Sequence, residues 1–252
     1  MYGILNVSKS GMSSTQNKIN VISNNIVNSN TAGYKKLDVE FQDLVRAGLS
    51  NNSYPTNDVN ATTGTGIKST TEVRNFTQGS LKNTKISTNL AIDGEGLFRV
   101  IRSDNTYAYT RNGEFSVDAN GTLVDDAGNI LDIQFEDEKN YNNSGITSDN
   151  LSVNKQGEVF VNDEKIGNIN LYKPTGDNDV LSASGNLFIA NDGVELIAAD
   201  GDIYQGYTEM SNVEISQEFT DLIAMQRAFQ LNSKGFTVAD EMWSMINNLQ
   251  SR

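Results

Sequence analysis

The stretch VEISQEFTDLIAMQRAFQLNSKGFTVADEMWSMINNL, residues 213–249, decides the fold that this chain is expected to adopt. Apolar residues recur along it every seven positions, with a companion row three residues later, which is typical of a helix that buries one face. We expect Gly235 to interrupt this helix, because glycine weakens a helix by about 1 kcal/mol relative to alanine. The main row is Ile215, Leu222, Phe229, Phe236 and Trp243, and the companion row includes Met225, Ala239 and Ile246.

A second heptad pattern lies at the other end of the chain, in LNVSKSGMSSTQNKINVISNNIVNS, residues 5–29. Its companion row is polar except at Ile22, and Gly33 is a plausible cap beyond its end. One such stripe alone would indicate only a core-facing helix. Two stripes at opposite ends suggest that the two terminal helices pair with each other as a coiled coil. The rows are Leu5, Met12, Ile19 and Ile26, and Ser8, Thr15, Ile22 and Ser29.

The middle of the chain reads as β structure from about residue 70 to 204. Short runs rich in β-forming residues, such as Leu97–Arg102, Tyr107–Thr110 and Ile130–Phe135, are separated by Gly-containing turns. Their spacing predicts antiparallel hairpins in a barrel or sandwich. Before them lies a polar stretch expected to be an extended linker, preceded by a helix-like pattern at Val39–Leu49.

The predicted fold class is therefore α+β, with long terminal helices and an inserted antiparallel all-β domain. The expected boundaries are residues 1–36 for the N-terminal helix, 37–69 for the linker, 70–206 for the β domain and 207–252 for the C-terminal helix. An apolar stripe on both long helices cannot be buried fully within one two-helix hairpin. Burial of the remainder against neighbouring copies would favour assembly.

Composition excludes several functions. The net charge of −13 opposes nucleic-acid binding, and the absence of Cys and His removes Cys/His zinc sites and His-based catalytic triads. The spacing Ser152-x-x-Lys155 matches a catalytic pair, but it lies in a β-patterned run where chance is the better explanation. A calcium loop starting at Asp118 lacks the required Gly and Glu. We therefore predict no catalytic residue, cofactor or metal site.

The N-terminus has no basic segment followed by an apolar core, so we expect no cleaved secretory signal peptide. No apolar run approaches the length of about 20 residues that a membrane-spanning helix needs, so no membrane insertion is expected.

Several motifs resemble those of the flagellar rod and hook protein family, and they occur in the family's order over nearly the whole chain. Residues 21–35, VISNNIVNSNTAGYK, resemble its N-terminal signature, and residues 205–213, QGYTEMSNV, resemble its Q-G-x-x-E-x-S-N-V. Residues 94–100, GEGLFRV, and 109–115, YTRNGEF, are similar to its G-x-G-F-F-x-V and Y-T-R-x-G-x-F. The motif residues singled out are Asn24, Asn25, Asn28, Thr31, Gly33, Tyr34, Gly94, Gly96, Ser211, Asn212, Val213, Gln226, Arg227 and Asn232.

This resemblance implies a non-enzymatic structural subunit that stacks helically into the hollow shaft of the bacterial flagellum. It also implies export through the flagellar type III apparatus without a cleaved signal, an extracytoplasmic location, and neighbouring rod and hook proteins as partners. Length and motifs look most like the family's distal rod members, with proximal rod members as the alternative. A secreted cell-wall or glycan-binding module is a further alternative.

The resemblance also places the assembly interface on the terminal helices. The residues predicted to form that interface are Leu5, Met12, Ile19, Ile22, Ile26, Ile215, Leu222, Met225, Phe229, Phe236, Trp243 and Ile246.

Overall fold

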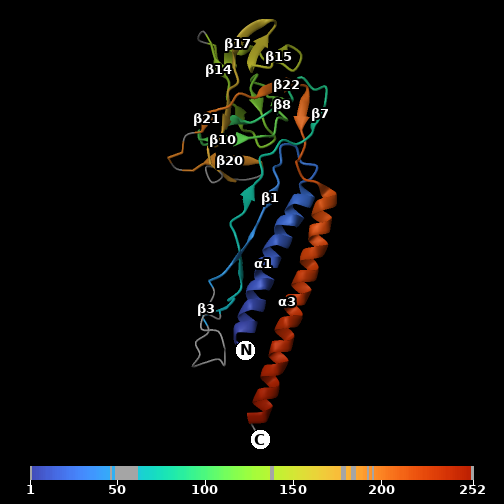
Figure 1. Cartoon of the computed structure of the whole chain (residues 1–252). Coiled ribbons are helices and arrows are strands. Elements are labelled where there is room, and N and C mark those ends of the chain that lie inside the picture. The colour runs from blue at the N-terminus through green and yellow to red at the C-terminus, as the bar shows by residue number, and fades with distance from the viewer. Residues whose placement is uncertain are drawn as a thin grey trace. The chain divides into compact units, whose positions relative to one another are not determined.

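The computed structural model describes residues 2–45, 47–48, 62–136, 139–176, 180–182, 186–191, 193–194 and 196–250. Long helices stand at both ends of the chain, α1 (Tyr2–Val27) and α3 (Ile215–Gln250), with antiparallel strands between them (Figure 1). This confirms the predicted α+β class. Within the described residues, neither long helix is apolar enough over its length to cross a membrane.

The chain divides into two compact units, which we call the helical unit and the β unit. The helical unit contains residues 1–27, 37–73 and 214–252, and the β unit contains residues 28–36 and 74–213. The stretch that was expected to be a linker therefore belongs with the helices. The β unit in turn takes nine residues that follow α1 and the residues just before α3.

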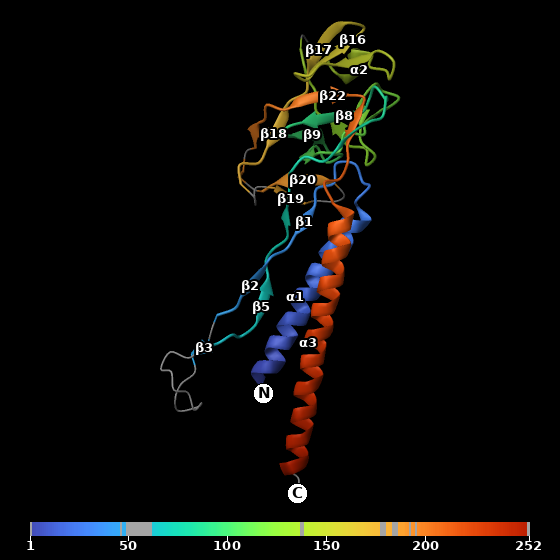
Figure 2. The ribbon, with the colours of Figure 1, turned by 45° about the vertical axis from the view of Figure 1, so that its right-hand side comes forward.

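In the helical unit, α1 and α3 lie side by side and run antiparallel in both views (Figures 1 and 2). The described residues between 37 and 73 form short strand pairs, with β2 antiparallel to β5 and β3 antiparallel to β4. The helix-like pattern at Val39–Leu49 was thus misleading, because β2 lies within it; Arg46 and Leu49 are outside the described residues. The strands here are β1 (Leu37–Asp38), β2 (Phe41–Asp43), β3 (Ala47–Gly48), β4 (Thr62–Thr63), β5 (Ile67–Ser69) and β6 (Val73–Arg74).

The expected interruption of the C-terminal helix at Gly235 was wrong. Helix α3 is continuous over 36 residues and passes through Gly235. A Cβ at this position would lie 3.1 Å from the Ser8 hydroxyl oxygen on α1. The glycine therefore permits a close approach of the two helices, and tertiary packing outweighs its low helix propensity.

The β unit is built around the antiparallel hairpin of β9 and β10, in which Tyr109 pairs with Arg99. The main sheet has the order β11-β12-β13-β9-β10-β20-β19, with β18 also paired to β9 and β21 paired to β18. A four-stranded sheet, β14-β17-β16-β15, and the pairs β22–β8 and β23–β7 complete the unit. One continuous apolar core holds it together, and its fully buried members include Leu90, Phe98, Val100 and Leu131.

Most predicted β runs became strands, but Ile130–Phe135 is divided between β13 in the main sheet and β14 in the four-stranded sheet. The bounds of the β unit's elements are β7 (Leu81–Asn83), β8 (Leu90–Asp93), β9 (Leu97–Ile101), β10 (Tyr107–Thr110), β11 (Ser116–Val117), β12 (Leu123–Val124), β13 (Ile130–Leu131), β14 (Gln134–Phe135), α2 (Tyr141–Ser144), β15 (Leu151–Val153), β16 (Glu158–Val161), β17 (Glu164–Asn168), β18 (Leu171–Lys173), β19 (Val180–Ser182), β20 (Leu187–Ala190), β21 (Ile197–Ala198), β22 (Asp202–Gln205) and β23 (Tyr207–Glu209).

Candidate assembly site: the helix pair and a buried ion cluster

The contacts between α1 and α3 fix the register of the helix pair. Near one end the Asn25 amide donates to the Glu218 carboxylate at 3.2 Å. Further along, a Cβ on Gly11 would lie 2.8 Å from the amide nitrogen of Asn232, and Ser8 lies beside Gly235. Between these contacts the residue number falls on α1 by as much as it rises on α3, as expected for antiparallel helices. Extending this register places Tyr2, the first residue of α1, level with about Glu241, and α3 continues beyond that point.

The face of α1 that meets α3 is made of small and polar residues. Ser8, Gly11, Thr15, Ile22 and Asn25 are all buried, at successive spacings of three, four, seven and three residues. The Thr15 hydroxyl donates a hydrogen bond to the Gly11 carbonyl at 2.8 Å, so its polar group is satisfied within the helix. The polar companion row expected from the sequence thus lies in the helix contact, where its small side chains let α3 approach closely.

Replacing Gly11 with Ala is expected to destabilise the helical unit by about 1–3 kcal/mol, the usual cost of overpacking a tight contact. The new Cβ would fall within 2.9 Å of three atoms of the Asn232 side chain. The measurement is urea unfolding of the purified chain, followed by helical circular dichroism.

Gly3 provides a matched control, because a Cβ there meets nothing within 4 Å and the residue lies in the same helix. Gly3→Ala should leave stability unchanged or raise it slightly through helix propensity. Combining Gly11→Ala with Asn232→Ser should recover part of the loss. Equal effects of Gly3→Ala and Gly11→Ala would contradict the tight contact.

The residues predicted to form the assembly interface are distributed over several environments. Ile22 is fully packed, with 2% of its surface exposed. Leu5, Met12, Ile19, Ile26, Leu222, Met225, Phe229 and Trp243 are partly buried, and Ile215, Phe236 and Ile246 are exposed. The structure brings both helices together, but contacts between copies at these positions stay a prediction.

Asn25 ties the chain that follows α1 back onto the helix. Its side-chain oxygen accepts from the Leu37 backbone N–H at 3.0 Å, and its amide donates to the Leu37 carbonyl at 2.9 Å. Since the same amide also reaches Glu218, one buried side chain contacts three segments of the helical unit. Asn24, its neighbour in the motif, is exposed.

The most buried ionic group of the β unit is a cluster of Lys35, Arg111 and Glu209, each no more than 3% exposed. The Lys35 ammonium donates to one Glu209 oxygen at 2.7 Å, and the same oxygen accepts from the Gly79 N–H at 2.7 Å. The Arg111 guanidinium binds the other Glu209 oxygen. Burial lowers the pKa of Lys35 from its usual value, and the attraction of Glu209 opposes that shift.

The backbone of several motif glycines contacts this cluster. Arg111 donates to the carbonyl of Gly94 at 2.7 Å and to that of Ile92 at 3.0 Å, and it also reaches the Gly96 carbonyl. Gly94 and Gly96 have φ values of 107° and 142°, which other residues rarely adopt. Gly33, at φ 68°, donates its N–H to the Glu209 carbonyl at 2.8 Å. A Cβ there would lie 2.3 Å from the Asn112 nitrogen, so only glycine fits.

Four separate sequence motifs therefore meet at one point in the β unit. Gly33, Gly94 and Gly96 were recognised from the sequence as motif residues, whereas Lys35, Arg111 and Glu209 were not predicted to form a site. The signal was available, because each of the three lies within a quoted motif and together they form a set of opposite charges. Their proximity follows only from the tertiary structure.

The other motif residues mostly fasten the backbone. The Asn212 side chain accepts from the Lys36 N–H at 2.7 Å and donates to the carbonyls of Asn75 and Thr77, both at 2.9 Å. The Ser211 hydroxyl accepts from the Val213 N–H at 3.3 Å. Thr31 donates its N–H to the Asn28 carbonyl at 3.1 Å, Tyr34 is buried under the Arg74 guanidinium, and Gln226 and Arg227 are exposed on α3.

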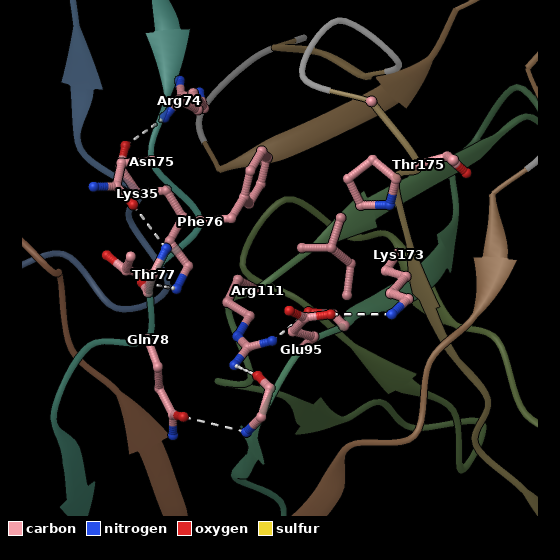
Figure 3. A pocket seen from close by; sticks show the side chains of 15 residues that line it. Lys35, Arg74, Asn75, Phe76, Thr77, Gln78, Glu95, Arg111, Lys173 and Thr175 are labelled. Carbon is pink, nitrogen blue, oxygen red and sulfur yellow. Dashed lines mark hydrogen bonds and ion pairs between the residues drawn. The ribbon is translucent and has the colours of Figure 1, made fainter.

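A cavity of about 640 Å³ lies next to the ion cluster, and Figure 3 shows its lining. Polar side chains around it are already engaged with one another: Lys173 pairs with Glu95 at 3.0 Å, and Gln78 accepts from the Gly94 N–H at 3.2 Å. The arrangement cross-links the loops of the β unit.

The Ser152-x-x-Lys155 spacing does not lie on a helix. Ser152 lies on β15, where side chains alternate between faces, and Lys155 stacks 5.1 Å over the Tyr204 ring. A helix would be needed to bring the hydroxyl and the amine onto one face.

Comparison with known proteins places the chain. Three family descriptions match along it: "Flagella basal body rod protein" at residues 5–35, "Flagellar hook protein FlgE/F/G D1 domain" at 91–161 and "Flagellar basal body rod FlgEFG protein C-terminal" at 204–249. The first and last cover most of α1 and α3, and the second covers the centre of the β unit. The matched segments also hold Lys35, Arg111 and Glu209.

Full-length relatives agree with the family match. The chain is 32% identical to "Flagellar basal-body rod protein FlgG" of Borreliella burgdorferi, with 96% of both chains covered. It is 34% identical to the protein of the same name from Agrobacterium fabrum, over 96% of this chain and 97% of the relative. It is also 28% identical to "Flagellar hook-basal body complex protein FlhP" of Bacillus subtilis, over 93% of this chain.

The terminal helices pair with each other, and the motif residues of the β unit serve packing and ion pairing, as in a structural subunit rather than an enzyme. The chain belongs to the flagellar basal-body rod protein family. Several FlgG proteins of that family match it over nearly its whole length.

Proposed function

We propose that this chain is the distal rod subunit of a bacterial flagellum, and that it polymerises helically into a hollow shaft joining the motor to the hook. The observation that carries the proposal is the full-length similarity to FlgG proteins, which includes both helices as well as the β unit. Family members of similar size that form the proximal rod are the alternative.

The helix pair supplies the assembly core in this proposal. The buried face of α1 follows the alternating spacing of a coiled coil, which supports that description of the pair. Apolar side chains such as Ile215 and Ile246 stay exposed on α3 in the single chain. Their burial between copies would contribute about 25 cal/mol per Å² of apolar surface.

Neighbouring rod and hook proteins are the proposed partners, and the flagellar type III apparatus is the proposed route of export to an extracytoplasmic site. The geometry of α1 supports export without cleavage. Residues 2–27 form the helix that packs on α3, so removal of that segment as a signal would abolish the helix pair.

Deletion of the gene in its flagellated host, followed by electron microscopy of isolated basal bodies, tests the proposal. We expect rods that stop short, no hooks and no swimming, with all three restored by the intact gene. Immunogold label on a tagged copy should lie on the rod segment nearest the hook. Label at the motor end would favour a proximal subunit, and cosedimentation with peptidoglycan in place of rod labelling would favour a wall-binding module.

Complementation of the deletion strain with a gene that carries Ser152→Ala tests the assignment as a non-enzymatic protein. Ser152 is exposed on β15, and its hydroxyl has no role in packing the core. We expect full swimming, measured on soft agar. A swimming defect with normal rods would reveal chemistry at this serine.

A further inference from the structure

A second apolar face runs along the outer side of α3, away from α1. Its side chains are between 41% and 76% exposed and recur at spacings of seven, four, three and four residues, which is a heptad pattern of its own. We call this face the distal stripe, and its members are Leu231, Val238, Met242, Met245 and Leu249.

The end of the stripe lies on the part of α3 that extends beyond α1. In the antiparallel register the first residues of α1 are level with Glu241, so residues 242–250 have no part of α1 opposite them. This overhang, MWSMINNLQ, contains no charged residue. A helix end that stays in water normally carries charges, whereas this one is apolar at five positions.

A second exposed apolar feature lies near the start of the same helix. Phe219 and Ile223, one turn apart, are about half exposed, and we call them the proximal patch. The proximal patch and the end of the distal stripe are far apart on one chain. Ile223 and Met245 are separated by about 33 Å at 1.5 Å of rise per residue.

The distribution of charge indicates that the occupant of these surfaces is another copy of this chain. The two lysines of α1 with Arg227 and Lys234 of α3 balance the four acidic residues of α3, so the two helices together carry no net charge. The whole chain carries −13, all of which therefore lies outside the helices. Copies of this acidic chain therefore meet with the least net-charge repulsion along the uncharged helix pair.

We propose that the distal stripe of one copy docks on the proximal patch of the next copy, head to tail. This inference rests on the proposed function, because it specifies which surfaces of α3 the polymer uses. Because the two patches are different and lie at separate points on one helix, the contact between copies is heterologous, and such a contact can be repeated from copy to copy. A patch that paired with itself would instead close into a dimer.

Cross-linking between introduced cysteines tests the contact directly, since the chain has no cysteine of its own. The double variant Ile223→Cys with Met245→Cys is expressed from the native locus and treated in intact cells with a short bismaleimide. We expect a ladder of dimers, trimers and larger species on a denaturing gel. A link within one chain is excluded by the distance along the helix. Each single variant should remain monomeric.

The outcomes separate this inference from the proposed function. Dimers from Met245→Cys alone would show that the stripe pairs with itself, which overturns the head-to-tail contact. A double variant that is present in rods by immunogold labelling but gives no ladder would also overturn it, while leaving the rod function intact. Absence of the parent protein from basal bodies would instead overturn the proposed function.

A charge placed on the stripe gives an independent measurement. Val238→Glu should reduce the number of hooks per cell at least tenfold, with the variant still exported and its helical circular dichroism unchanged, because Val238 is exposed in the single chain. Thr237→Glu adds the same charge at the next residue, which points to a different side of α3 and is also exposed. It should leave hook number unchanged. Equal effects of the two variants, or none from Val238→Glu, would contradict the stripe.

Discussion

Replacing Glu209 with Ala is expected to lower the free energy of unfolding of the β unit by about 3–5 kcal/mol, the range seen when one partner of a buried ion pair is removed. Lys35 and Arg111 would then face each other with their carboxylate gone, both in a site that water barely reaches. The Gly79 N–H would lose its acceptor as well. Few single substitutions in this chain should have a larger effect.

The measurement is chemical unfolding of the purified chain, followed by far-ultraviolet circular dichroism in the β region. Glu95→Ala is the matched control, because Glu95 also pairs with a lysine, Lys173, but is 81% exposed. Exposed pairs contribute about 0–1 kcal/mol, so this variant should unfold almost as the parent does. A similarly small effect at Glu209 would show that the cluster does not hold the β unit together.

The substitution Ile22→Asp is expected to disrupt the helical unit and abolish rod assembly while the β unit stays folded. Ile22 lies in the buried face of α1, so the new carboxylate would be enclosed without a cation. The effective penalty for such a buried charge is several kcal/mol. The β unit has its own continuous core, built from residues 90–203, which does not include α1.

In cells, Ile22→Asp should give no hooks and no swimming. The purified variant should lose helical signal and keep the β unfolding transition of the parent. Val27→Asp is the matched control, because it places the same charge on the same helix at a side chain that is 80% exposed. Unfolding of the β unit in Ile22→Asp would show that the two units do not fold separately, and assembled rods would show that the site tolerates a charge.

The ion cluster brings together charged residues from motifs that lie far apart in the sequence. Lys35 comes from the segment after α1, Arg111 from the turn after β10 and Glu209 from the end of β23. Each contributes a charge that would be costly to bury alone, and the three together offset that cost. The surrounding glycines are needed because the backbone must come close to Arg111 and Glu209 without side chains in the way.

Local patterns in the sequence were sufficient to predict the two long helices and most of the strands. The heptads at residues 5–29 and 213–249 correspond to α1 and α3, and the runs Leu97–Arg102 and Tyr107–Thr110 became β9 and β10. Such features depend on periodicity and turn residues that are read within a few positions of one another. The α+β class and the family resemblance, confirmed by the matches along the chain, were accessible for the same reason.

Long-range packing decided the rest. Only the tertiary structure shows that the small polar row of α1 faces α3, that Gly235 is a point of close approach and that residues 37–73 join the helices. It alone divides Ile130–Phe135 between two sheets and brings Lys35 to Glu209, 174 positions away. The sequence by itself determined which segments are helical or extended, because those preferences act between neighbouring residues. Which faces are buried, and which charges meet, depended on contacts between segments that no local pattern encodes.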